Sequence, residues 1–239
     1  MVPHEEPDAP RRDPRLVHYS DIVEQGGLQP ALVSSARTHD LDLGAAETDP
    51  VSQKHHWSTA EFPSSRGAMR VHLGHGARRF AITLDSHHGH VWASGSTEDL
   101  GRAAEAMAFW RQGATLGELH ERFPFMEFDR LSQAYEEGNP VETQWGLLIE
   151  DDVFLSYREL LSMLRANGKL GRLFPFFSHW VLRLALDCYD SQAGELLIKP
   201  TPEGGYAVWS SEAPESKRDC NSLEEVVEAA EAKMEEFTA

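Results

Sequence analysis

The chain has 239 residues, enough to bury a core as one large or two small domains, and it carries 39 Asp and Glu against 22 Lys and Arg, a formal net charge of −17. Binding to phosphate backbones depends on clustered Lys and Arg, so we do not expect DNA or RNA as a partner. The sequence has no apolar run approaching about 18 residues and no N-terminal signal segment, so we expect a cytoplasmic protein that binds no membrane. Its two cysteines, Cys188 and Cys220, lie outside any CxxC pair, and we expect them to be reduced thiols.

The first 54 residues contain little that predicts a core. Residues 1–16 hold four prolines among charged residues, which predicts a flexible tail. Asp21–Gln25 and Pro30–Arg37 have the composition of two short helices, the second with proline in its first turn. Asp40–Lys54 has no periodicity, so we expect a long loop there.

A β-meander is expected next. Met69–Leu73, Phe80–Leu84 and Val91–Ala93 alternate apolar with other residues and are separated by glycine-containing turns. We expect Leu73 to pair near Arg78 and Val71 near Phe80.

That register places His72 opposite Arg79. A helix capped by Ser96 or Thr97 follows, with a 3.6-residue apolar period from Leu100 and Gly113 as its stop, and it should cover one face of the sheet.

Three capping boxes predict further helix starts. They are Thr115 with Glu118, Ser156 with Glu159, and Ser222 with Glu225. The last helix, from Leu223 to Phe237, has an apolar stripe opposite its glutamates. Residues 212–239 carry nine acids and three bases, which indicates either a solvated helix face or a surface for a basic partner.

The second half has the same pattern as the first. Three strands are expected at Trp180–Leu186, Glu195–Lys199 and Tyr206–Trp209, before the last helix. We therefore predict an α+β fold of two antiparallel βββα-like halves, residues 17–128 and 129–239, each with a meander covered by helices. The alternative of one compact domain stays open. Phe123-Pro124-Phe125 and Phe174-Pro175-Phe176, the latter placed before a strand, are interpreted as core wedges.

The only cluster with chemical potential is a group of histidines. Seven of the twelve fall between His55 and His90, but strand ends about 20 Å apart separate His72 and His75 from the later ones. Within the turn that follows Asp85, we take His87, His88 and His90 as candidate catalytic residues, and Asp85, His87 and His90 as candidate ligands of a divalent metal. Solvated turn histidines are the competing interpretation, and no other cofactor is indicated.

Other catalytic patterns are absent from the sequence. It contains no GxSxG elbow, Walker loop or Rossmann fingerprint. Glu150-Asp151-Asp152 could present carboxylates to Mg²⁺ or serve a helix dipole. Cys220 precedes a helix, but neighbouring acids argue against a reactive thiolate.

Several runs resemble an uncharacterised actinobacterial family, a domain of unknown function usually labelled as natural-product biosynthesis proteins. The resemblance spans residues 17–239. Its runs are His18-Tyr19-Ser20-Asp21 through Gly26-Gly27-Leu28 and Ala31-Leu32, Trp92 to Leu100, Phe109 to Leu119, and Phe123-Pro124-Phe125. The resemblance implies a biosynthetic setting and brings no catalytic residues with it.

Three functions follow as hypotheses, and the sequence leaves open whether the protein is an enzyme. The first is an accessory protein of bacterial natural-product biosynthesis that binds a protein or peptide partner, such as an enzyme, carrier or precursor peptide. The second is a small tailoring enzyme using the His87/His88/His90 turn. The third, from acidity and α+β character alone, is a cytoplasmic immunity protein against a basic toxin.

Overall fold

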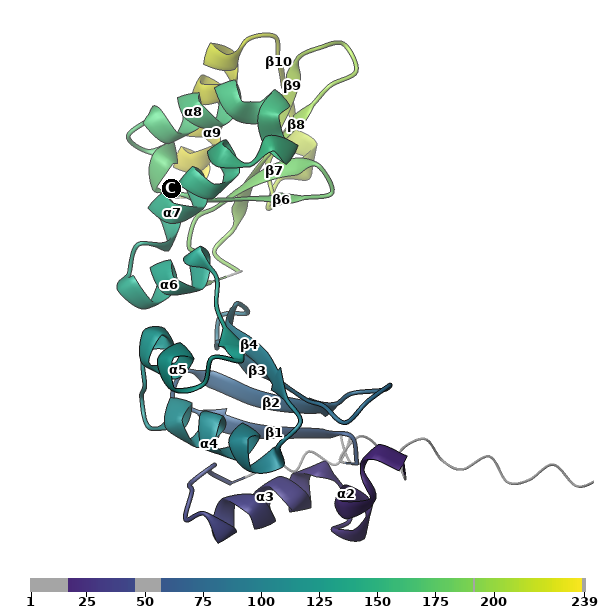
Figure 1. The fold of residues 1–239 in the computed structure, drawn as a ribbon. Helices are drawn as coiled ribbons and strands as arrows, with labels where there is room; N and C mark the ends of the chain where they lie inside the picture. The colour runs from purple at the N-terminus through teal and green to yellow at the C-terminus, as the bar shows by residue number, and fades with distance from the viewer. Residues whose placement is uncertain (1–16, 46–56, 191, 238–239) are drawn as a thin grey trace, which may run out of the picture. The chain divides into compact units, whose positions relative to one another are not determined.

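The computed structural model describes residues 17–45, 57–190 and 192–237, and the chain divides into two compact units between Asp129 and Arg130 (Figure 1). Each unit has its own hydrophobic core. The predicted tail, residues 1–16, lies outside the described residues, as do residues 46–54 of the predicted loop Asp40–Lys54.

Unit 1, which ends at Asp129, is a five-stranded antiparallel sheet in the order β1-β2-β3-β4-β5 with helices packed against it (Figure 1). Its strands are β1 (Thr59–Ser64), β2 (Gly67–Leu73), β3 (Phe80–Asp85), β4 (Val91–Thr97) and β5 (Met126–Glu127). Its helices are α2 (Ser20–Glu24), α3 (Leu28–Thr38), α4 (Leu100–Arg111) and α5 (Leu116–Arg122).

The core of unit 1 follows from the alternation of the central strands. Every second residue of β2 and β3 is buried, as the period of two requires of a half-buried strand. Helix α4 contacts β3 and β4, and its alanines let its backbone approach other elements closely. The buried side chains of α4 are Ala103, Ala104, Ala106, Met107, Ala108 and Trp110.

The expected register of the β2–β3 hairpin is wrong by two residues. Leu73 pairs with Phe80 and Val71 with Ile82, so His72 lies opposite Ala81 and not Arg79. The loop therefore runs from Gly74 to Arg79, and the large apolar residues of both strands pair on the buried face.

Tyr19, ahead of α2, fixes this longer loop. Its hydroxyl lies 3.0, 3.0 and 3.1 Å from the carbonyl oxygens of Gly74, Ala77 and Arg79, and it accepts a hydrogen bond from the Arg79 amide at 2.9 Å. The side chain is 2% exposed. Because the partners are about 60 positions away, no local pattern predicts the contact.

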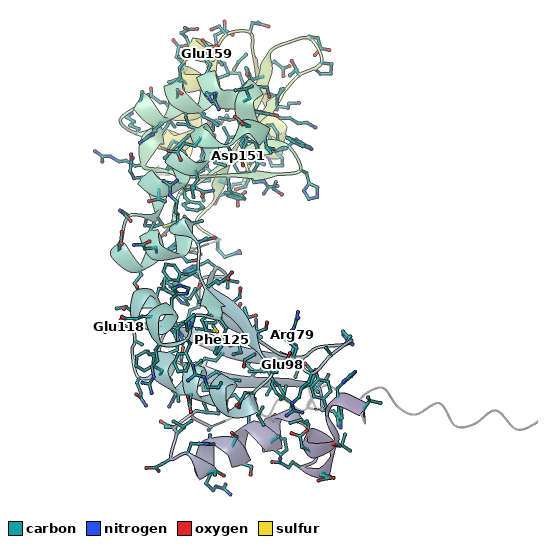
Figure 2. All side chains as sticks on the ribbon, viewed as in Figure 1. Arg79, Glu98, Glu118, Phe125, Asp151 and Glu159 are labelled. Atoms are coloured by element: carbon teal, nitrogen blue, oxygen red, sulfur yellow. The ribbon has the colours of Figure 1, made fainter. Side chains whose placement is uncertain are left out.

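Arg78 joins the same loop to α2. It donates to both carboxylate oxygens of Asp21 at 2.8 Å, to the His18 carbonyl at 2.9 Å and to the Glu98 carbonyl at 3.1 Å. The guanidinium lowers the pKa of Asp21 below its ordinary value. Arg79 and Glu98 are labelled at this end of the sheet in Figure 2.

Unit 2, from Arg130, also contains a five-stranded antiparallel sheet, in the order β10-β9-β8-β7-β6. Its strands are β6 (Phe174–Ser178), β7 (Val181–Ala185), β8 (Glu195–Pro200), β9 (Tyr206–Ser210) and β10 (Arg218–Cys220). Its α-helices are α6 (Arg130–Glu137), α7 (Pro140–Glu150), α8 (Arg158–Ala166) and α9 (Leu223–Glu236). Its short 3₁₀ helices are η2 (Asp152–Tyr157), η3 (Leu170–Arg172) and η4 (Pro214–Ser216).

The α+β class with two antiparallel meanders is confirmed, although each sheet has five strands where three were expected. In unit 2, the Phe174-Pro175-Phe176 run is not a wedge before a strand but lies in β6 itself. Trp180, expected to begin a strand, sits in the turn between β6 and β7. Proline is tolerated in β6 because β6 is the last strand of its sheet and has a neighbour on one side only.

Two of the three predicted capping boxes begin helices. Thr115 and Glu118 bond each other's backbone at the start of α5, and the Ser222 hydroxyl accepts from the Glu225 amide at the start of α9. The helix expected at Ser156 is present as α8, but it begins at Arg158, and Ser156 lies inside η2 and does not cap it. The cap expected at Ser96 or Thr97 is instead supplied by Asp99, which accepts from the first amides of α4.

Tyr19→Phe tests the contact that holds the β2–β3 loop. Removing the hydroxyl leaves the Arg79 amide and its carbonyl neighbours without their central partner, so we expect the free energy of unfolding to fall by about 1–3 kcal/mol in urea titrations. Asp21→Asn should cost less, about 0–1 kcal/mol, because its ion pair is half-exposed. Equal costs would contradict this ranking.

Ser222→Ala and Ser156→Ala form a matched pair. We expect the first to lower the free energy of unfolding by about 1 kcal/mol, since it removes the cap of α9, and the second to leave it nearly unchanged. Thermal and urea unfolding of both variants measure the difference. A large loss at Ser156 would mean that η2 depends on that hydroxyl.

Candidate functional site: a histidine-rich turn and an aromatic surface

The turn between β3 and β4 is organised by the Ser86 hydroxyl. It accepts hydrogen bonds from the amides of His88 and His90, at 3.1 and 3.0 Å, and lies 2.9 Å from Nδ1 of His90. The Ser86 amide donates to the His90 carbonyl at 2.8 Å. With two amides donating to its oxygen, the hydroxyl has its proton left to give, so it donates to Nδ1 of His90.

The candidate ligands are not gathered around one point. Asp85 accepts a hydrogen bond from Arg70 at 2.8 Å, and His87 is exposed. The His90 ring packs edge-on against Trp92, with centroids 4.4 Å apart. Among residues 17–45, 57–190 and 192–237, no group of three or more His, Cys, Asp and Glu is placed to hold a metal ion.

The surroundings of His90 favour its neutral form. Burial lowers its pKa below the ordinary value, and the nearby His88 lowers it further, while Asp129 acts in the opposite direction. A neutral imidazole beside a hydroxyl is the arrangement of a base with a nucleophile. Here, however, the two amides already occupy the hydroxyl oxygen, as in a structural turn. A catalytic role for His87, His88 and His90 stays a prediction.

The other chemical candidates have structural partners. Asp151 caps η2 by accepting from the Val153 amide at 2.9 Å, and Asp152 lies 3.6 Å from Arg158. Both cysteines are free thiols. Burial raises the pKa of Cys188 and of Cys220, so neither is a ready nucleophile at neutral pH.

An aromatic surface on unit 2 was missed by the sequence analysis. We call Val153, Phe154, Leu155, Phe177 and Trp180 the Trp180 surface. Val153 and Trp180 are each 61% exposed and Leu155 is 57% exposed. Large apolar side chains are rarely exposed together on a soluble protein without a binding role.

Ring contacts join the 3₁₀ segment η2 to the β6–β7 hairpin. Phe154 stacks on Phe177 with centroids 4.2 Å apart and planes at 8°, and meets Trp180 edge-on at 6.5 Å. Tyr157 packs against Phe177 at 4.8 Å and donates from its hydroxyl to the Trp180 carbonyl at 3.2 Å. A non-helical backbone at Phe154 interrupts η2 where the stacked ring lies.

The turn that presents Trp180 is strained. Ser178 pairs with Val181, so the hairpin loop is the two residues His179 and Trp180, with φ of +52° and +62°. Two-residue hairpins with positive φ normally use Asn-Gly, and a bulky residue in this region costs on the order of 1–3 kcal/mol. The chain thus holds an exposed tryptophan in a conformation that disfavours it, and the observed strain motivates a functional interpretation.

One sequence signal could have indicated this turn. Phe174 to Leu186 reads as a nearly continuous apolar run, but strands of more than about ten residues are uncommon, so the run had to contain a turn. The run contains no glycine or asparagine that would show the position of this turn. The turn at His179 and Trp180 could not be located from the sequence, because neither residue is typical of a two-residue hairpin turn.

An open cavity of about 290 Å³ in unit 1 lies beside α3. Its charged residues are partly committed, since Asp42 pairs with Arg111 at 3.3 Å and Arg111 also donates to the Pro63 carbonyl. The cavity is open, whereas a small-molecule site usually encloses most of the surface of its ligand.

Comparisons with protein-family models, with curated proteins and with solved structures gave no match for this chain. In the part of the chain that the structure describes, no helix has both the length and the apolar character needed to cross a membrane.

His90→Asn should change how stability depends on pH. Because burial lowers the pKa of His90, the unfolded state binds more protons as pH falls below the ordinary value of 6.5, and the native protein loses stability on acidification. We expect this loss to be smaller in the variant, measured by urea unfolding across that pH range. An NMR titration of His90 that gave an ordinary or raised pKa would contradict the expectation.

Proposed function

We propose that this chain is an accessory, partner-binding protein of bacterial natural-product biosynthesis that recognises a protein or peptide through the Trp180 surface. The observation that carries the proposal is Trp180 itself, 61% exposed, held in a left-handed turn and anchored through its carbonyl by Tyr157. A side chain that the core does not use, kept at a cost in backbone strain, is best explained by an external contact.

The form of the surface favours a macromolecule over a small ligand. Tryptophan is among the residues most enriched at binding hot spots, where it is surrounded by apolar contacts that exclude water. Val153 and Leu155 flank Phe154 in sequence and are themselves exposed, so a partner that covers the Phe154 and Trp180 rings can also contact them. Small molecules are instead recognised in concave sites that cover most of their surface.

The biosynthetic setting comes from the resemblance of residues 17–239 to the natural-product family described above. In that setting the partner is an enzyme, a carrier protein or a precursor peptide. An accessory role agrees with the Ser86 turn, where the hydroxyl next to His90 is occupied by two backbone amides.

The test separates binding from stability at one turn. In the double variant His179→Asn, Trp180→Gly, the left-handed turn receives its preferred residues, so we expect the free energy of unfolding to rise by about 1 kcal/mol or more. The same variant should lose at least about 30-fold in affinity for the partner, as expected of a hot spot. Partner binding is measured by crosslinking in the producing bacterium, then by titration of the purified partner.

Val33→Ala is the matched control, because Val33 is a partly exposed apolar residue on α3 in unit 1. It should leave both binding and stability nearly unchanged. If the double variant retained full affinity for a partner that the wild type binds specifically, the Trp180 surface would not be the binding site.

A further inference from the structure

We infer that the partner segment bound at the Trp180 surface is basic as well as apolar, and that it presents an arginine beside an apolar side chain. This inference rests on the proposed function and adds the chemistry of the partner. It follows from the charge around the surface, from the open face of Trp180 and from the poor fit of the other occupants.

Of the two segments that build the surface, residues 146–157 contribute three acids, and residues 173–182 contribute no acid and one histidine, His179. Neither segment contains Lys or Arg, and the three acids are Glu150, Asp151 and Asp152. The Asp152 side chain is 96% exposed. The aromatic surface therefore has an acidic margin on a chain whose net charge is −17.

Among the described residues, two arginines form ion pairs with acids of the margin. Arg130 lies 3.0 Å from Glu150. Arg158 lies 3.6 Å from Asp152 and donates from Nε to the Ile149 carbonyl at 3.0 Å. These ion pairs involve Glu150 and Asp152, while Asp151 and Glu159 of the described chain form no ion pair with Lys or Arg, so two carboxylates of the margin remain open to a basic partner.

The exposed indole of Trp180 suits an arginine in particular. A guanidinium can stack on an aromatic face while its N–H groups reach a carboxylate, and tryptophan is the best aromatic acceptor for a cation. Elsewhere in the chain, Arg66 lies over Trp110 with 3.2 Å between Cζ and the ring centroid. Among the described residues, no Lys or Arg is placed over the Trp180 ring, so its face is available to a cation of the partner.

Two other occupants fit less well. An added strand would pair along β6, the last strand of its sheet, but Pro175, the second residue of that strand, has no N–H to donate to it. A second copy of this chain would bring another 17 net negative charges to an acidic margin. Recognition through side chains of a basic partner avoids both difficulties.

The experiment titrates the full chain with short synthetic peptides in a glycine and serine background. One peptide carries Arg-Leu-Arg, and its matched relatives carry Lys-Leu-Lys, Arg-Ser-Arg or Glu-Leu-Glu. Binding is followed by NMR through the Trp180 indole N–H and the methyl groups of Val153 and Leu155. We expect these signals to shift with Arg-Leu-Arg, less with the Lys and Ser peptides, and not with the Glu peptide.

Variants locate the interaction. Trp180→Ala should weaken binding of the Arg-Leu-Arg peptide about tenfold or more. Asp152→Asn should weaken it several-fold and reduce its dependence on salt. Asp219→Asn, which removes an exposed acid from β10, should leave the affinity and its dependence on salt unchanged.

The outcomes distinguish this inference from the proposed function. If the Glu peptide shifted the Trp180 signals as much as the Arg peptide, or if no peptide shifted them, the basic character of the partner would be refuted. The proposed function would still stand if the natural partner lost affinity for the Asn-Gly variant. If that partner bound the Asn-Gly variant with wild-type affinity, the proposed function and the inference of a basic partner would both be refuted.

Discussion

Burial of one face of an antiparallel meander is the constraint on which each unit of this protein depends. In unit 1 it excludes a slip of one residue, which would turn the apolar side chains of β3 out of the core, and the observed register pairs Phe80 with Leu73 and Ile82 with Val71 on the buried face. In unit 2 it places Leu182 and Leu184 of β7 inside, and the chain must then reverse within two residues at His179 and Trp180.

In both units a tyrosine hydroxyl fixes the hairpin loop that results. Tyr19 binds the carbonyl oxygens and an amide of the β2–β3 loop, and Tyr157 binds the Trp180 carbonyl in the β6–β7 turn. Tyr19 immediately precedes α2 and Tyr157 lies at the end of η2, and each is more than 20 residues from the loop that it holds. A loop carbonyl that would otherwise need water thus has a protein partner, and the loop keeps one conformation.

The contrast between the histidine-rich turn and the Trp180 surface explains why binding, and not catalysis, is the better proposal. At the first, the Ser86 hydroxyl satisfies two amides and a ring nitrogen, so the polar groups of the turn serve one another. At the second, the backbone is strained and the largest side chain contacts solvent over most of its surface. A group already satisfied within the fold has little left to offer a ligand, whereas exposed apolar area gains free energy when a partner covers it.

The α+β class and the two meanders could be predicted from the sequence, because they depend on local periodicity. The helix starts at Thr115 and Ser222 could be predicted as well, because a capping box joins residues only three apart. The sequence by itself could not determine that Asp85 would be bound by Arg70 across the sheet, that Ser156 would fall within η2, or that Tyr19 would reach the Gly74–Arg79 loop. The Trp180 surface was likewise decided only by tertiary structure. Its rings come from segments about 20 to 30 residues apart, and Trp180 is exposed only because burial of β6 and β7 places the turn at that position.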